Sequence, residues 1–173
     1  KISNNKRKEY NMGFDLSGLK PKIEEGTTEP VIDWDKEPSE EEETQHWEAL
    51  KTFRNLNTGV YFRNNIWWWH PMWTYVSENL CSKVLTEKDH ERGHYNDGHE
   101  INAIKANYIA DQINKAYFTG ELKKAELELD RLRKAEWVRK PKKDEVVPTV
   151  PFSVENCLEF ASFARNSGGF TID

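Results

Sequence analysis

Residues 89–100, DHERGHYNDGHE, carry three of the five histidines of the chain and include a spacing used by zinc peptidases. His90, Glu91 and His94 fit H-E-x-x-H, in which two histidines one helical turn apart bind zinc and the glutamate acts as general base. In those enzymes the helix is largely buried, whereas TEKDHERGH is polar on every face. The third histidine, His99, follows an Asn-Asp-Gly turn and lies one residue too early for the extended motif. The sequence therefore does not favour zinc peptidase chemistry.

A looser metal site around the Asn-Asp-Gly turn is a better supported alternative. A tight turn can bring imidazole and carboxylate groups from its two sides together, and this mixed ligand set suits zinc or manganese. The residues predicted to converge are His94, Asp97, His99 and Glu100, with His90 as an outer candidate. Such a site would make the protein a metal-dependent hydrolase.

The same turn has two simpler interpretations. Asn96 and Asp97 can satisfy the backbone of their own turn, which leaves the neighbouring histidines solvated. Alternatively, the turn is a binding loop in which His94, Tyr95 and Asn96 offer hydrogen-bonding groups and an aromatic ring to a ligand. The sequence leaves these interpretations open.

A second candidate stretch, YFRNNIWWWHPMW at residues 61–73, combines aromatic rings with polar groups. We expect Trp69 and Trp73 to pack in the core, but three consecutive tryptophans cannot all face one side of a helix or strand. At least one indole should therefore line a surface near the guanidinium of Arg63. A ring that stacks on a base, beside an arginine that pairs with phosphate, is a receptor for a nucleotide-like ligand.

This ligand hypothesis requires residues 61–73 and 93–99 to meet around an accessible concavity. The predicted ligand-binding residues are Tyr61, Arg63, Asn64, Asn65, Trp67, Trp68, His70, His94, Tyr95, Asn96 and Asp97. The chain has no glycine-rich phosphate loop, no Walker lysine and no G-x-S-x-G motif. A non-catalytic binding protein without a cofactor is therefore favoured over an NTPase or a hydrolase.

Composition excludes several classes of protein. A formal net charge of -5 argues against strong binding to a nucleic-acid backbone. Cys81 and Cys157 lack C-x-x-C spacing and sit at apolar helical positions, which indicates reduced, packed thiols. Neither a membrane-spanning stretch nor a secretory signal is recognisable, so we expect an intracellular protein.

Capping residues and apolar periodicity predict a mainly α fold with minor β structure (α+β). Ser39 and Glu42 form a capping box, and Pro71 is expected at the first position of a later helix. About five helices are predicted at 40–55, 71–84, 100–119, 121–139 and 153–167, with a short helical segment at 86–93. Short strands are predicted near 14–16, 58–67 and 170–172.

These elements suit a single compact domain over residues 12–173, large enough for one core. Residues 1–11 are polar and basic and are predicted to be a disordered extension, and residues 140–151 a polar linker. The predicted helix at 121–139 has apolar residues at heptad-like spacing within a highly charged stretch. It is the natural contact for a homo-oligomer, and a structural or interaction protein is thus a further alternative.

Four blocks of the sequence carry a resemblance that covers nearly the whole chain from Met12 onward. The blocks are MGFDLSGLKPK, YFRNNIWWWHPMW, GHYNDGH and PFSVENCLEFASFARNSGGFTI. Together they resemble a family of small uncharacterised proteins encoded by tailed bacteriophages. Some members have a cysteine-rich, zinc-knuckle-like insertion where this chain reads RKPKKDEVVPTVP, so zinc binding at that place is not implied here. The resemblance implies a phage source and action in the host cell cytoplasm, but no chemistry.

The sequence as a whole favours a phage-encoded binding protein that holds a small nucleotide-like ligand or a host protein during infection. Sequestering a defence signalling nucleotide would be one such role. The alternatives are the metal-dependent hydrolase and the oligomeric interaction protein described above.

Overall fold

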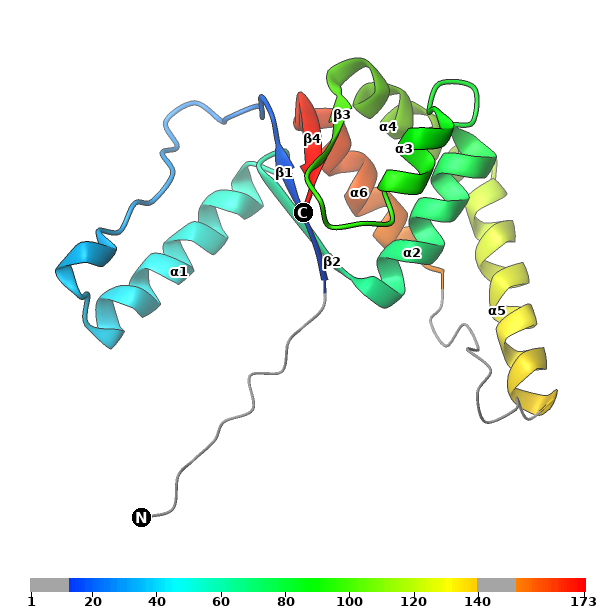
Figure 1. Cartoon of the computed structure of the whole chain (residues 1–173), viewed down its shortest axis with the longest axis horizontal. Helices are drawn as coiled ribbons and strands as arrows, with labels where there is room; N and C mark the ends of the chain where they lie inside the picture. The colour runs from blue at the N-terminus through cyan, green and yellow to red at the C-terminus, as the bar shows by residue number, and fades with distance from the viewer. Residues whose placement is uncertain (1–12, 140–151) are drawn as a thin grey trace, which may run out of the picture.

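The computed structural model describes residues 13–139 and 152–173, with side chains in the fifth helix described as far as Ala135. Within these ranges it contains six α-helices and one four-stranded antiparallel sheet, which confirms the predicted α+β class (Figure 1). The predicted extension at 1–11 and the predicted linker at 140–151 lie outside the described residues.

The sheet is assembled from four segments that lie far apart in the sequence. Its order is β2 (Tyr61–Asn65), β1 (Gly13–Gly18), β4 (Gly169–Ile172) and β3 (His99–Asn102). Along β1, Phe14 and Leu16 are buried while Asp15 and Ser17 face outward, which is the alternation of a half-buried strand. The sheet therefore has one apolar face and one polar face.

Three helices cover the apolar face of the sheet: α2 (Ile66–Thr74), α4 (Ala103–Phe118) and α6 (Val154–Asn166) (Figure 1). Their buried side chains form one core with those of the strands. The largest completely buried side chains are Trp69, Trp73, Phe160, Phe163 and Phe170. The predicted core positions of Trp69 and Trp73 are thus confirmed.

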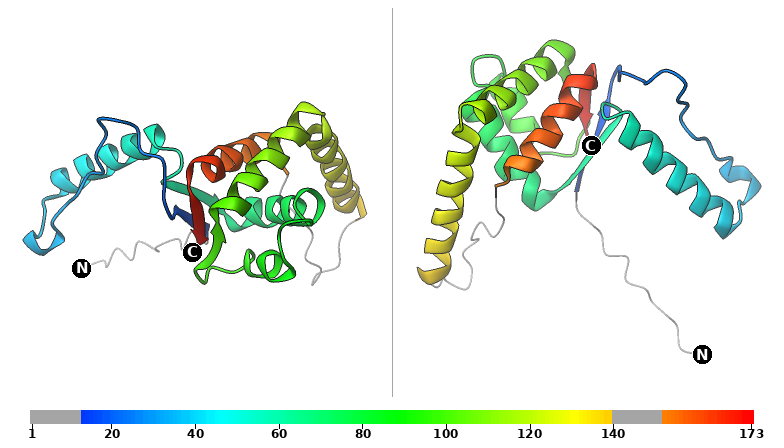
Figure 2. Two further views of the ribbon diagram at one scale, coloured as in Figure 1. Left: turned by 90° about the horizontal axis from the view of Figure 1, so that it is seen from above. Right: turned by 180° about the vertical axis from the view of Figure 1, so that it is seen from behind.

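Two helices extend away from this body on opposite sides, as Figures 1 and 2 show. One is α1 (Glu40–Leu56), where only Leu50 and Phe53 are buried, and the other is α5 (Glu121–Arg139). The predicted capping box begins α1, with Glu42 N–H donating to Ser39 Oγ and the Glu42 carboxylate accepting from Ser39 N. A short 3-10 helix, η1 (Trp34–Lys36), precedes it. None of the helices in the described residues is long and apolar enough to cross a membrane.

Pro71 does not begin a helix, contrary to the prediction. Helix α2 starts at Ile66, because the Asn65 side chain accepts a hydrogen bond from Trp68 N at 3.0 Å and supplies the cap. Pro71 therefore lies inside α2. The helix changes at Tyr75 to a π-helical segment, η2 (Tyr75–Leu80), and does not continue as an α-helix to residue 84.

The predicted helix at 100–119 begins three residues later than expected. Residues 99–102 form strand β3, whose edge pairs with β4 in the register His99 opposite Ile172. Asn102 then caps α4 by accepting from Lys105 N at 3.0 Å. Residues 99–102 form a strand because they pair with the distant strand β4, and the local periodicity of the sequence cannot show this pairing. A short helix, α3 (Glu87–Arg92), lies just before it.

Candidate functional site

The two stretches singled out from the sequence meet in space. Trp69 Nε1 donates a hydrogen bond of 2.7 Å to the carbonyl oxygen of Gly93, and Trp73 Nε1 donates one of 3.0 Å to that of His90. Buried indole N–H groups need acceptors, and the C-terminal end of α3 with its cap residue Gly93 provides both. The stretches are therefore joined by a packed contact in which Trp69 and Trp73 are wholly buried.

A stacked histidine pair continues this contact toward the surface. His70 Nδ1 and His94 Nδ1 lie 2.8 Å apart, and the ring centroids are separated by 5.0 Å. Burial lowers the pKa of both rings, and the pKa of His94 falls to about 4 because His70 and His90 add to the effect. Both rings are consequently neutral at neutral pH, with one nitrogen donating and the other accepting.

The predicted metal ligands are not brought together. Asp97 forms an ion pair of 2.5 Å with Arg92, and His99 Nε2 lies 3.1 Å from Asp89 Oδ1. The nitrogens of His90 are taken by Ser77 Oγ at 2.6 Å and by Glu78 Oε1 at 3.1 Å. Across residues 13–139 and 152–173, no group of three or more His, Cys, Asp or Glu side chains is arranged to hold a metal ion. The donor set therefore does not fit zinc or manganese, and the hydrolase alternative has no support from the geometry.

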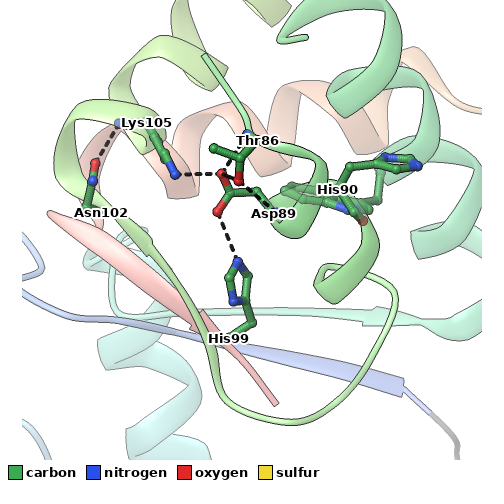
Figure 3. Close-up of polar contacts among 7 residues, drawn as sticks. Thr86, Asp89, His90, His99, Asn102 and Lys105 are labelled. Atoms are coloured by element: carbon green, nitrogen blue, oxygen red, sulfur yellow. Dashed lines mark hydrogen bonds and ion pairs between the residues drawn. The ribbon is translucent and has the colours of Figure 1, made fainter. Parts of the chain in front are cut away.

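Asp89 forms the main buried polar centre of this region (Figure 3). Its carboxylate accepts from Thr86 N at 2.8 Å, from Thr86 Oγ1 at 2.7 Å, from His99 Nε2 and from Lys105 Nζ at 2.5 Å. Burial alone would raise the pKa of Asp89, but Lys105, Thr86 and His99 outweigh it and lower the pKa to about 2. The carboxylate is fully paired, so it joins α3, β3 and α4 and leaves no free group for chemistry. In the sequence, only the capping-box spacing of Thr86 and Asp89 points to a structural role for this carboxylate.

The other predicted residues of the Asn-Asp-Gly turn point in different directions. Asn96 Nδ2 donates to the carbonyl oxygen of Gly13 at 2.8 Å, which ties the turn to β1. Tyr95 is exposed, and so is Glu100 on β3. The turn thus serves mainly to anchor the chain.

The remaining predicted ligand-binding residues, within 61–70, also lie in different places and do not form one site. Asn64 is buried and donates to Asn156 Oδ1 at 2.8 Å, whereas Asn65 caps α2. Trp67 is exposed, and Trp68 is half-buried. Tyr61 and Arg63 lie on the polar face of the sheet, where both contact Asp15. Of the predicted ligand-binding residues, Tyr61 is the one that lines the cavities described next.

Two adjoining cavities form a groove between α1, β2 and α6, which we call the α1–β2 groove. One has a volume of about 390 Å³ and the other of about 280 Å³, and Arg54, Asn55 and Tyr61 border both. The first is also lined by Thr58, Phe62, Glu159, Ser162 and Phe163, and the second by Trp47, Leu50 and Lys51. The smaller cavity therefore has aromatic and cationic walls.

Arg54 is the central cation of the α1–β2 groove. Its guanidinium carbon lies 3.9 Å from the centroid of the Tyr61 ring, a cation–π contact that fixes the arginine beside both cavities. Its Nε atom is buried and has no hydrogen-bond partner among the residues that the structure describes. Burial, followed by the hydrogen bond to Asp15, raises the pKa of Tyr61, so the phenol stays protonated at neutral pH. Arg54 is half-buried and lines both cavities, so its positive charge faces an anion bound there.

Helical spacing places the polar wall of the groove on one stripe of α1. Trp47, Lys51 and Arg54 follow one another at i, i+4 and i+7, so their side chains share one face. The rise of 1.5 Å per residue spreads them over about 10.5 Å. This spacing is visible in the sequence, but by itself it does not indicate a groove, because nothing local shows that Tyr61 lies opposite Arg54.

Comparison with known proteins adds nothing to this geometry. No protein-family model, no curated protein and no solved structure matches the chain. The arrangement of Trp47, Lys51, Arg54 and Tyr61 suits stacking and anion binding. Elsewhere, Ser77 Oγ lies 2.6 Å from His90 Nδ1, but Ser77 is buried and its hydroxyl donates to the carbonyl oxygen of Trp73. The α1–β2 groove is therefore the candidate binding site that the geometry provides.

Proposed function

We propose that this protein is a non-catalytic binding protein for a small anionic aromatic ligand of the nucleotide type, held in the α1–β2 groove. The observation that carries the proposal is Arg54 stacked on Tyr61 at 3.9 Å, with Lys51 and a half-exposed Trp47 on the same stripe of α1. Stacking surfaces and paired cations are what such a ligand requires.

The charges along the groove orient the ligand. Glu159 lines the larger cavity and repels phosphate, whereas Lys51 and Arg54 border the smaller one. The phosphate therefore binds to Lys51 and Arg54, with a charge-assisted, bidentate contact to the guanidinium. The base stacks on the indole of Trp47, whose side of the groove is open.

The resemblance to phage proteins gives this binding activity a biological setting. A phage protein acting in the cytoplasm of an infected bacterium could sequester a signalling nucleotide of the host defence. The role needs affinity and no turnover, which agrees with a groove that has cations and rings but no catalytic group.

Thermal unfolding of the full chain with and without a panel of nucleotides tests the proposal. A ligand that binds only the folded state stabilises it by RT ln(1 + [L]/Kd), about 2.7 kcal/mol at a concentration of about 100 Kd, so the Tm rises by several degrees. We expect a phosphorylated ligand to raise the Tm and the corresponding nucleoside to raise it much less.

Substitutions in the α1–β2 groove test whether the ligand that raises the Tm binds there. Lys51 is exposed, so Lys51→Ala should leave the Tm of the free protein unchanged while reducing the shift caused by the ligand. Arg54→Ala should abolish that shift. Lys36→Ala, a change of the same charge outside the groove, is the matched control and should keep it. If no nucleotide of the panel moves the Tm of the wild-type protein, the proposal is wrong.

A further inference from the structure

Helix η1 and the first half of α1 lie away from the sheet and its covering helices (Figure 1). Three aromatic rings from these two elements form a cluster. Trp34 of η1 lies 6.1 Å from Trp47 and 6.2 Å from His46 between ring centroids, and His46 lies 5.3 Å from Trp47. Trp34 is 50% exposed and Trp47 is 54% exposed. We call these three residues the arm cluster.

The arm cluster is held in place by local structure. Asp33 caps η1 by accepting a hydrogen bond from Asp35 N at 3.2 Å, and Ser39 with Glu42 caps α1. These caps fix the chain on both sides of the turn that brings Trp34 against α1. A preorganised aromatic surface loses little conformational entropy when a partner binds, which is the property of interface hot spots.

The residues around the arm cluster are predominantly negatively charged. Residues 24–43 contain ten carboxylate side chains and a single cationic one, Lys36, and nearly all of these carboxylates are exposed. Such a surface repels anions and attracts cations. It therefore differs from the α1–β2 groove, whose smaller cavity has Lys51 and Arg54 in its wall.

We propose that the arm cluster is a docking surface for a basic segment of a partner protein. Arginine side chains of the segment stack on the exposed indoles of Trp34 and Trp47, and the surrounding carboxylates of residues 24–43 pair with the neighbouring cations. Arginine over tryptophan is the most favourable cation–π pair in proteins, and aromatic residues and arginine dominate binding energy at protein interfaces. Charge complementarity excludes an acidic partner. This surface shares Trp47 with the α1–β2 groove, whereas Trp34 does not line the groove and belongs to the arm cluster alone.

Titration of the full chain with a short peptide of alternating arginine and leucine tests this proposal. We expect binding by calorimetry that weakens as salt is added, since the attraction is partly electrostatic. The same peptide with glutamate in place of arginine should not bind. Equal binding of the two peptides would show that the surface does not select cations and would overturn the proposal.

Single substitutions separate the aromatic contact from general charge attraction. Trp34→Ala should weaken binding of the arginine peptide about tenfold, and Trp34→Phe should restore most of the affinity, because the phenyl ring still stacks. Trp67→Ala removes an indole that is 56% exposed on α2 and is the matched control that should bind like wild type. Trp34 does not line the α1–β2 groove, so loss of peptide binding in Trp34→Ala with an unchanged nucleotide-induced Tm shift distinguishes the two proposals.

Two further results would contradict the proposal. If Trp34→Ala binds the arginine peptide as tightly as the wild-type protein, the aromatic cluster is not the docking surface. If sedimentation shows that the wild-type chain is a dimer and that Trp34→Ala is a monomer, a second copy of this chain occupies the cluster instead of a basic partner.

Discussion

The Nδ1 atoms of His70 and His94 lie 2.8 Å apart, so these two rings share one proton along their contact. Only one of the two nitrogens can donate, and the other must be unprotonated to accept. His70 comes from α2 and His94 follows α3, so the pair joins the tryptophan-bearing helix to the turn that leads into β3. Protonating both rings would replace this hydrogen bond with a repulsion between two cations.

We expect acid to weaken the fold through His94. Its pKa is about 4 in the folded protein against 6.5 as the ordinary value, so the unfolded chain binds more protons between these two pH values. Stability is therefore complete above about pH 6.5 and falls as the pH drops toward about 4. Because the ring is only partly buried, the loss should be about 1–2 kcal/mol, less than the full shift would imply.

Chemical denaturation across this pH window measures that loss. His94→Gln should flatten the dependence of the free energy of unfolding on pH, whereas His46→Gln on α1 should follow the wild-type curve. A wild-type curve that is flat between pH 6.5 and about 4 would contradict the expectation.

Gly93 packs directly against the indole ring of Trp73, so Gly93→Ala should destabilise the protein strongly. A Cβ atom at this position would lie 2.1 Å from Cε2 and Nε1 of Trp73, a completely buried ring that cannot move aside. Overpacking of this kind costs about 3 kcal/mol, and it would also strain the hydrogen bond from Trp73 to the His90 carbonyl.

Gly26→Ala is the comparison for Gly93→Ala. Gly26 has φ of +82° and nothing near its missing Cβ, so only the conformational cost of about 1 kcal/mol applies. Thermal unfolding of both variants should show the larger loss for Gly93→Ala. Similar losses for the two would mean that the Trp73 ring can move out of the way.

Asp89→Asn should be among the most destabilising polar substitutions in this chain. The change removes the anion that Lys105 and His99 contact in a buried setting, and breaking a buried pair on one side costs about 3–5 kcal/mol. Asp130→Asn on α5 breaks ion pairs with Arg133 and Lys134 near the surface, where solvent screens the charges, and should cost much less than Asp89→Asn.

The low pKa of the Asp89 carboxylate also predicts that the protein loses stability in strong acid. Its pKa is lowered from 3.8 to about 2, so the stability that it contributes is present above about pH 3.8 and is lost as the pH falls through about 2. This window lies below that of His94. Urea denaturation should show a wild-type loss here that is absent in Asp89→Asn, and equal slopes for the two proteins would argue against the paired, buried carboxylate.

Asn57 joins the end of α1 to the segment that runs from β1 toward that helix. Its side chain accepts from Glu24 N at 2.7 Å and donates to the carbonyl oxygen of Phe53 at 2.9 Å, and the residue is 1% exposed. Asn57→Ala leaves these groups unpaired, which should cost about 1–3 kcal/mol. Hydrogen exchange should become faster in α1 and unchanged in α4. Uniform acceleration in both helices would show that α1 unfolds only with the whole protein.

The sequence by itself determined the features that depend on neighbouring residues. The capping spacings at Ser39, Thr86 and Ser153 place three helix starts correctly, because a cap hydrogen bond joins residues three apart in the chain. Alternation over residues 14–16 and the apolar positions of Trp69 and Trp73 likewise identify strand β1 and part of the core. These signals establish the α+β class.

Only the tertiary structure decided where side chains from distant segments meet. Strand β3 exists because His99–Asn102 pairs with β4 near the end of the chain, and Pro71 lies within a helix because Asn65 caps it earlier. The ligand hypothesis required residues 61–73 and 93–99 to meet around an accessible concavity. They meet through the buried contact of Trp69 with Gly93, whereas the groove lies beside Arg54 and Tyr61. The physical reason is that hydrogen-bond pairing and close packing between segments far apart in sequence set these contacts, and no local periodicity encodes them.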